Sequence, residues 1–190
     1  MTVAVRAQRV PGEAGTWVFL FGDMVLFQVF FTTFLHERGT APTLFDHSRR
    51  TLDLGIGLAN TLVLLSSSLL VATAIRVIRR GAGRAASRML SVAALCGLTF
   101  IGLKVVEYTL AVSHHHGPSV NTFYLYYFIL TGLHLFHVVL GTVVLVLLAV
   151  QARRPELSAK RMMLVEGGAC FWHLVDLLWI FLFPLLYLAS

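Results

Sequence analysis

The stretch FWHLVDLLWIFLF, residues 171–183, decides the fold. Nearly all of its side chains are apolar enough to dissolve in lipid, yet His173 and Asp176 lie three residues apart in its middle. A carboxyl group at the centre of a membrane helix costs about 2.5–3.5 kcal/mol on insertion scales. Because lipid offers such a group no hydrogen bond, the pair indicates a helix that contacts other helices inside a membrane protein.

The composition of the whole chain supports this interpretation. Its 190 residues are 57% hydrophobic and 13% charged, whereas soluble domains average about 45–50% apolar and about 25% charged residues. The net charge of +6 comes from basic residues at the ends of apolar runs, which indicates membrane topology and argues against nucleic acid as a partner. Cys96 and Cys170 fall inside apolar segments and form no CxxC pair, so neither a disulfide framework nor a zinc site is predicted.

Five apolar runs are long enough to cross a bilayer, which takes about 20 residues each. They cover approximately residues 15–36, 53–75, 90–112, 123–149 and 167–188. No soluble domain fits in the gaps between them. We therefore expect residues 1–190 to form a single domain, an all-α integral membrane protein built as a five-helix transmembrane bundle.

Basic residues alternate along the connections between these runs. Arginine and lysine gather in the N-terminal tail, in the connection between the second and third runs and in that between the fourth and fifth, whereas the connection between the third and fourth has neither. By the positive-inside rule, the N-terminus is expected in the cytoplasm and the C-terminus outside. The chain is predicted to be a multi-pass protein of a bacterial plasma membrane.

Several polar side chains lie at similar depths within these runs. At a rise of 1.5 Å per residue, Asp23 lies about 12 Å from the cytoplasmic end of its helix. His173 and Asp176 lie about 9 and 14 Å from the cytoplasmic end of the last helix. His134 and His137 lie about 20 Å above the cytoplasmic end of the fourth. These groups share a band in the inner half and centre of the bilayer.

The spacing of the polar residues places them on shared helix faces. His134 and His137, His173 and Asp176, and Lys104 and Glu107 are each separated by three residues. The Lys104 and Glu107 pair lies nearer the outer surface. We expect these groups to face other helices, and we predict an interhelical polar cluster that consists of His134, His137, Glu166, His173 and Asp176.

Three interpretations of these residues remain open from the sequence alone. They can form interhelical hydrogen bonds, which contribute about 0.6 kcal/mol each. They can ligate haem or a metal, although only three histidines lie in the apolar runs apart from His36 at the very end of the first, and two of these share one helix. They can form a proton path or transport site, for which Asp23, Glu107 and Lys104 are the candidate proton or lipid site.

Aromatic residues near the ends of the runs predict an interfacial belt. The members of this expected belt are Trp17, Tyr108, Tyr124, Tyr126, Tyr127 and Tyr187.

Several motifs together resemble subunit III of haem–copper cytochrome oxidases. TGLHLFHVVLG (131–141) is similar to that family's T-G-x-H-x-x-H signature, and FWHLVDLLWIFLF is similar to W-H-x-V-D-x-x-W-x-F of its final helix. NTLVLLSSS (60–68) and EY (107–108) match two more positions, and GTWVFLFGDMVLF (15–27) corresponds to a segment with an acid in the inner part of the membrane. The resemblance covers all five expected helices in order.

The chain departs from the longer members of this family in two ways. Those members have seven helices, so this chain lacks the first two. The acid here is Asp23 in a GDM context, where oxidase subunits usually have Glu after Ser. The short length, this Asp and the Pro-Gly before the first helix resemble the NorE-type branch, an accessory subunit associated with nitric oxide reductase.

The resemblance implies a non-catalytic chain that binds neither haem nor copper itself. The redox centres belong to a partner, subunit I, and the family holds phospholipids in a cleft between its first two helices and the rest. It also implies support for proton uptake, with a candidate protonic role for Asp23, while His173 and Asp176 are expected to tie the last helix to His134 and His137. The alternatives are a NorE-type subunit of a nitric oxide reductase and an independent proton-coupled carrier.

Overall fold

A computed structural model of the chain describes residues 14–154 and 158–188, and this part of the chain is helical apart from short connections. The long helices are α1 (Ala14–Thr40), α3 (Leu54–Arg79), α4 (Gly83–Ser113), α5 (Thr122–Ala152) and α6 (Ala159–Phe183). Each belongs to one of five spans that are long and apolar enough to cross a membrane. The prediction of an all-helical protein with five membrane-spanning helices is therefore confirmed.

The helices differ from the prediction mainly at their ends. α4 begins at Gly83 rather than near residue 90, and α6 begins at Ala159 rather than near residue 167, because polar and basic first turns extend beyond the apolar runs. A short helix, α2 (Pro42–Arg49), occupies a stretch that was expected to be a connection, with Pro42 in its first turn, where proline is well tolerated. The last span changes to a π-helix, η1 (Pro184–Leu188), where Pro184 lacks the N–H that an α-helix needs.

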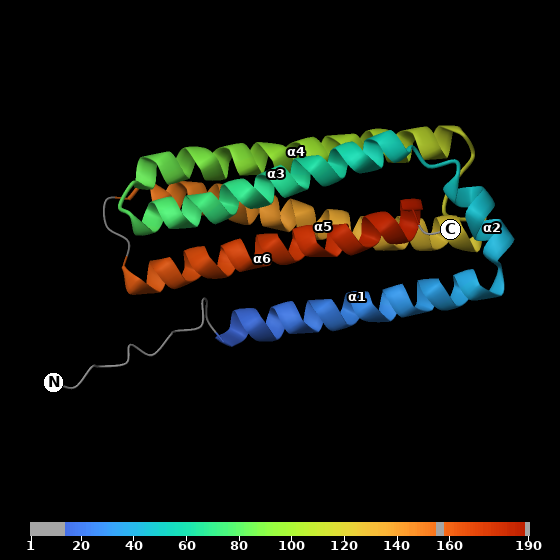
Figure 1. Cartoon of the computed structure of the whole chain (residues 1–190), viewed down its shortest axis with the longest axis horizontal. Coiled ribbons are helices and arrows are strands. Elements are labelled where there is room, and N and C mark those ends of the chain that lie inside the picture. Colours follow the sequence, from blue (N-terminus) through green and yellow to red (C-terminus); the bar gives the residue numbers. More distant parts are fainter. Residues whose placement is uncertain (1–13, 155–157, 189–190) are drawn as a thin grey trace.

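Figure 1 shows that successive long helices run in opposite directions. The start of α1, the turn between α3 and α4, the end of α5 and the start of α6 lie at one end of the molecule, and α2 and the connection between α4 and α5 lie at the other (Figure 1). The arginine-rich connections thus share one end, as the charge pattern requires. Which end faces the cytoplasm stays a prediction.

Helices α3 to α6 form a bundle, in which α4 packs against α3 and α5, and α6 packs against α5 and α3. α1 lies alongside this bundle against α5 and α6 (Figure 1). Much of α1 is exposed, including Val18 at 74% and Phe21 at 70% of their surface. An apolar helix with so much exposed surface suits contact with lipid or with another membrane subunit.

Glycines allow three helices of the bundle to approach closely around Trp172. A Cβ on Gly141 of α5 would lie 2.7 Å from the Trp172 ring, and one on Gly97 of α4 would lie 2.3 Å from Oγ1 of Thr142. Trp172 itself is fully buried. Small residues at helix interfaces are the usual means of close packing in membranes, because helix association there depends on van der Waals contact.

Candidate functional site

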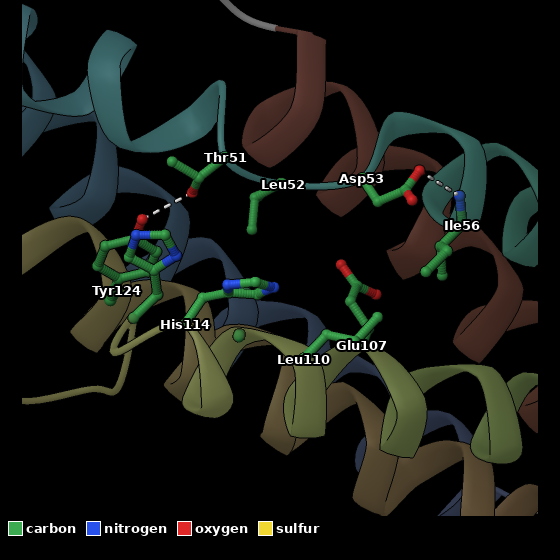
Figure 2. Close-up of a pocket in the computed structure, with 10 residues that line it drawn as sticks. Thr51, Leu52, Asp53, Ile56, Glu107, Leu110, His114 and Tyr124 are labelled. Carbon is green, nitrogen blue, oxygen red and sulfur yellow. Dashed lines mark hydrogen bonds between the residues drawn. The ribbon is translucent and has the colours of Figure 1, made fainter.

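A pocket of about 260 Å³ opens near the end of the bundle that carries α2. Figure 2 shows its lining, which comes from the start of α3, the end of α4 and the start of α5. Tyr124 closes one wall, where its hydroxyl lies 2.6 Å from Oγ1 of Thr51 and its ring stacks on His116. Asp53 caps α3, and its Oδ1 accepts hydrogen bonds from the N–H groups of Gly55 and Ile56. The side chain of Glu107 also lines this pocket.

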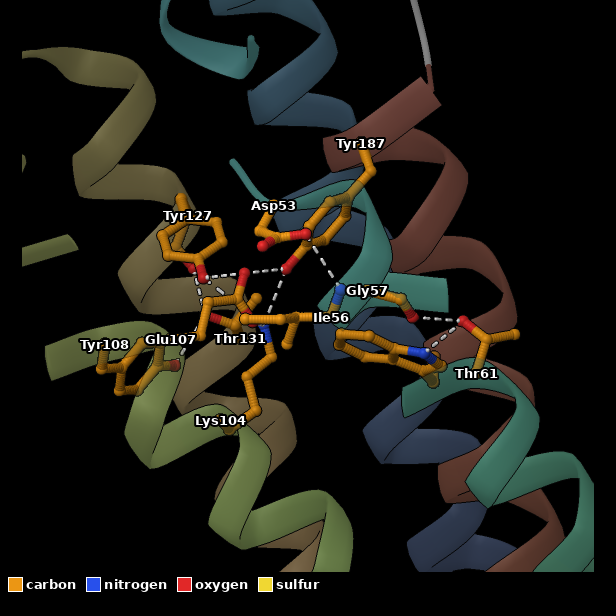
Figure 3. Close-up of polar contacts among 11 residues, drawn as sticks. Asp53, Ile56, Gly57, Thr61, Lys104, Glu107, Tyr108, Tyr127, Thr131 and Tyr187 are labelled. Atoms are coloured by element: carbon orange, nitrogen blue, oxygen red, sulfur yellow. Dashed lines mark hydrogen bonds and ion pairs between the residues drawn. The ribbon is translucent and has the colours of Figure 1, made fainter. Parts of the chain in front are cut away.

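Glu107 belongs to a buried polar cluster beneath the pocket, shown in Figure 3. Its Oε1 accepts hydrogen bonds from the hydroxyls of Tyr127, at 2.8 Å, and of Tyr187. Its Oε2 lies 2.9 Å from Nζ of Lys104. The Lys104 ammonium also donates to the Tyr187 hydroxyl at 2.9 Å. Three elements, α4, α5 and η1, are therefore joined through one carboxyl group.

Lys104 is fully buried and surrounded by aromatic rings. Its Nζ lies 4.9 Å from the ring centroid of Trp179, 5.1 Å from that of Tyr127 and 5.5 Å from that of Tyr187. Such cation–π contacts favour the charged ammonium when water is excluded. The predicted Lys104 and Glu107 pair is present, and the pocket above Glu107 brings it close to the exterior. The cluster can hold a charge or a proton near one end of the bundle.

A second polar pair joins α1 to α5. Oδ1 of Asp23 lies 3.0 Å from Nε2 of His137, and both side chains are buried. Nδ1 of His137 lies 2.8 Å from the carbonyl oxygen of Leu133. Because a carbonyl only accepts, Nδ1 carries a proton, and the Asp23 contact needs another proton between Oδ1 and Nε2. The pair therefore holds a proton that can reside on either residue.

The second carboxyl oxygen of Asp23 can still accept a hydrogen bond. Its Oδ2 is buried and has no partner among the residues that the structure describes. Phe27 of α1 packs edge-on against the His137 ring, with 5.6 Å between centroids, and shields the pair from one side. The arrangement can share and exchange a proton at the seam between α1 and the bundle.

The expected tie between His173 or Asp176 and the histidines of α5 is wrong. Nδ1 of His173 lies 2.7 Å from Oγ of Ser68, which belongs to α3 and also interacts with Asp176. Glu166 pairs with Arg79 at the end of α3, with 2.8 Å between their charged atoms. The polar stripe of α6 thus faces other helices, as predicted, but its partner is α3. Sequence alone contains no distances between helices, so it could not distinguish α3 from α5 as the neighbour of this face.

His134 is packed rather than paired. Its ring stacks on Trp179 at 5.2 Å and meets Phe100 edge-on at 5.6 Å. Neither ring nitrogen has a hydrogen-bond partner within the described part of the chain. Trp179 in turn donates from its indole N–H to Oγ1 of Thr61 at 3.0 Å, which joins α6 to α3.

The predicted aromatic belt is wrong for three of its members. Tyr124, Tyr127 and Tyr187 are buried and use their hydroxyls inside the bundle, because each meets a polar partner from another element. Tyr127 and Tyr187 are functional candidates that sequence reasoning missed. Both lie near helix ends, and nothing in the sequence separates a tyrosine that faces a buried carboxyl group from one that faces the interface.

An apolar cavity of about 330 Å³ lies between α1 and the bundle. Phe19 of α1, Val144 of α5 and Phe171 of α6 are among the side chains that line it. Gly167 and Gly168 of α6 also line it. The cavity can accept an acyl chain.

Comparisons with known proteins identify the family. Residues 11–190 match the family described as "Cytochrome c oxidase subunit III". The chain is 32% identical to "Cytochrome bo(3) ubiquinol oxidase subunit 3" of Pseudomonas aeruginosa, over 93% of this chain and 84% of that protein. It is 29% identical to "Cytochrome c oxidase subunit 3" of Alkalihalophilus pseudofirmus, over 93% of this chain and 85% of that protein. It is 29% identical to "Quinol oxidase subunit 3" of Bacillus spizizenii, over 93% and 86%. With nearly its whole length matched, the chain belongs to the cytochrome c oxidase subunit III family.

Proposed function

We propose that this chain is a non-catalytic subunit of a respiratory haem–copper oxidase in a bacterial plasma membrane. The observation that carries the proposal is the family match over residues 11–190, together with bacterial relatives that are named as subunits of cytochrome c and quinol oxidases. The five apolar spans agree with a membrane subunit. Its partner is then the haem–copper subunit I, and membrane lipids surround both.

In this proposal, haem and copper are carried by the partner. Within residues 14–154 and 158–188, no three His, Cys, Asp or Glu side chains gather as a metal site requires. Three histidines inside the spans have other contacts, since His137 meets Asp23, His173 meets Ser68 and His134 stacks on Trp179. The role that these contacts support is to hold the helices in place beside the partner.

Lipid binding is part of the proposed role. The apolar cavity between α1 and the bundle is the candidate site for an acyl chain. The exposed apolar residues of α1 support this, because lipid or a partner helix covers them at little cost.

Support for proton uptake is the second part of the proposed role. The Asp23 and His137 pair carries a shared proton at the seam of α1, and Asp23 is the acid that the family resemblance marks. Lys104 and Glu107 form a second candidate, with a pocket that brings Glu107 close to the exterior. With the N-terminus in the cytoplasm, Asp23 lies on the side from which an oxidase takes up protons.

A NorE-type subunit of a nitric oxide reductase is the second candidate. The acid Asp23 in its GDM context, which the family resemblance associates with that branch, favours it. Both candidates share a haem–copper partner, so the reaction of the captured complex distinguishes them. We expect a complex purified through a tag on this chain to consume oxygen with quinol or reduced cytochrome c, and reduction of nitric oxide without oxygen consumption would instead assign it to the second candidate.

A further inference from the structure

A cavity of about 760 Å³ lies at the arginine-rich end of the bundle, where the turn from α3 into α4 meets the end of α5. Four arginines line it: Arg84, Arg88, Arg153 and Arg154. From this we propose a specific binding site for the phosphate headgroup of an anionic phospholipid. The proposal requires only that the helices span a bilayer, and it does not depend on the proposed oxidase partner.

Direct contacts between α4 and the end of α5 hold the walls of the cavity in place. A Cβ on Gly83 would lie 2.2 Å from the carbonyl oxygen of Ala152, so the start of α4 touches the end of α5 directly. Nε of Arg153 donates to Oγ of the buried Ser87 at 3.0 Å, which fixes the base of that guanidinium against α4. These contacts hold arginines from two helices around one space.

The charges in the cavity lack a counter-ion within the described residues. The three ion pairs of that part of the chain are those of Arg79 with Glu166, Lys104 with Glu107 and His137 with Asp23, so none involves the four arginines of the cavity. The first turn of α4 adds to the attraction, because Ala82 gives its N–H groups no side-chain cap at a positive helix end. Arginine forks and free N–H groups are the donors that phosphate oxygens prefer.

The depth of the cavity fits a lipid headgroup. α4 has 31 residues, hence a length of about 46 Å, whereas the hydrocarbon core is about 30 Å thick. About 8 Å of the helix then extends beyond the core at each end. Arg84 and Arg88 lie within roughly that distance of the start of α4, so they lie in the headgroup layer.

The surface below the cavity fits the acyl chains. On α4, Val92 and Leu95 continue the face of Arg84 and Arg88 and are 47% and 60% exposed. On α5, Val150 and Leu147 lie in the last two turns before Arg153 and Arg154 and are 56% and 58% exposed. α4 packs against α5, and the arginines at the start of α4 share the cavity with those just after the end of α5, so both apolar stripes begin near the cavity. A headgroup site above a continuous apolar surface favours a phospholipid over a soluble anion or an acidic protein segment.

The site differs from the apolar cavity between α1 and the bundle. That cavity is formed by α1, α5 and α6, whereas the arginine cavity is formed by the α3–α4 turn, α4 and α5. The two can therefore be tested separately.

The test is lipid titration of the purified, delipidated full chain in a maltoside detergent, followed by native mass spectrometry. The lipids are dioleoyl phosphatidylglycerol, cardiolipin and, as a neutral reference, dioleoyl phosphatidylcholine. We expect both anionic lipids to bind in preference to phosphatidylcholine. Changing Arg84→Gln together with Arg154→Gln should weaken their binding by about 30-fold, because each basic residue near a membrane surface contributes about one factor of five.

The matched control removes two charges from the same end but outside the cavity, through Arg76→Gln together with Lys160→Gln. It should leave anionic lipid binding within about twofold of the parent. Equal weakening by both double variants would overturn the proposal, since it would show attraction by general surface charge. Should the glutamine pair fail to fold, the charge-preserving pair Arg84→Lys with Arg154→Lys is measured instead. It should bind the anionic lipids several-fold more weakly than the parent, because lysine lacks the two-pronged guanidinium that holds phosphate, while the control should not.

Inorganic phosphate distinguishes a lipid from a free anion. We expect millimolar phosphate to displace little of the bound phosphatidylglycerol, because it lacks the acyl chains. Displacement of the bound phosphatidylglycerol by an equal concentration of inorganic phosphate would overturn the lipid assignment. An unchanged affinity for all three lipids in the Arg84→Gln and Arg154→Gln variant would exclude a headgroup site altogether.

Discussion

Nε2 of His137 lies 3.0 Å from Oδ1 of Asp23, and this contact links α1 to the bundle through a shared proton. The backbone explains why the proton must be there, because Nδ1 of His137 is already engaged with the Leu133 carbonyl. A neutral imidazole with its proton on Nδ1 offers only a lone pair at Nε2, so Asp23 has to supply the hydrogen or the imidazole has to be doubly protonated.

Asp23→Asn should preserve the fold and change the protonic behaviour. The asparagine amide can donate an N–H to Nε2 in place of the acid, so the complex should assemble normally. It carries no exchangeable acidic proton, so turnover should match the parent at low pH and fall progressively below it as pH rises and proton supply limits the rate. The measurement is turnover of the reconstituted complex against pH.

His137→Leu is the control for this experiment. It leaves Asp23 without the partner that the structure shows and should reduce assembly as well as turnover, because a buried carboxyl group without a hydrogen bond is costly in lipid. If Asp23→Asn follows the parent over the whole pH range, the pair is structural only.

Breaking the Lys104 and Glu107 pair should strongly destabilise the end of the bundle that lies near α2. Replacing one partner, as in Lys104→Met or Glu107→Gln, leaves a buried group uncompensated and should lower the free energy of unfolding by about 3–5 kcal/mol. Reversible unfolding in mixed detergent measures this. The double variant should cost clearly less than the sum of the two single variants, because the second change removes the group that the first left unpaired.

Sequence reasoning located the membrane helices and most of the buried polar residues, because the apolar runs and the i, i+3 spacings are local features. Lys104 and Glu107 were paired correctly for this reason. It failed where a partner lies far along the chain. Tyr187 reaches Glu107 from the other end of the sequence, and Ser68 rather than His134 meets His173. Periodicity assigns a residue to a face of its helix, but the neighbour of that face depends on how the helices pack.

The His173 and Ser68 contact should be measurable as a coupling between α6 and α3. His173→Leu and Ser68→Ala each remove one side of the hydrogen bond. A double-mutant cycle should give a coupling of about 0.6 kcal/mol, typical of interhelical hydrogen bonds in membranes. The matched cycle of His173→Leu with His134→Leu should be additive, and coupling in that cycle alone would restore the tie to α5 that the structure replaces.

The orientation of the chain can be tested with single cysteines in a background where Cys96 and Cys170 are replaced by alanine. Ala85 in the arginine-rich first turn of α4 and Ser119 in the connection between α4 and α5 are both exposed. In intact cells, a membrane-impermeant maleimide should label Ser119→Cys, and it should label Ala85→Cys only after the cells are opened. The reverse pattern would invert the topology and would place Asp23 nearer the outer surface.

The central claim is that this chain acts beside a haem-bearing partner and carries no haem itself. The most direct measurement is the reduced-minus-oxidised spectrum of material captured through a tag on this chain, first in mild detergent and then after the partner has been dissociated. We predict a haem signal, with subunit I, in the captured complex and no haem signal in the isolated chain. Haem that stays with the isolated chain and disappears in His173→Ala would contradict the account, as would a chain captured in mild detergent with no haem protein at all.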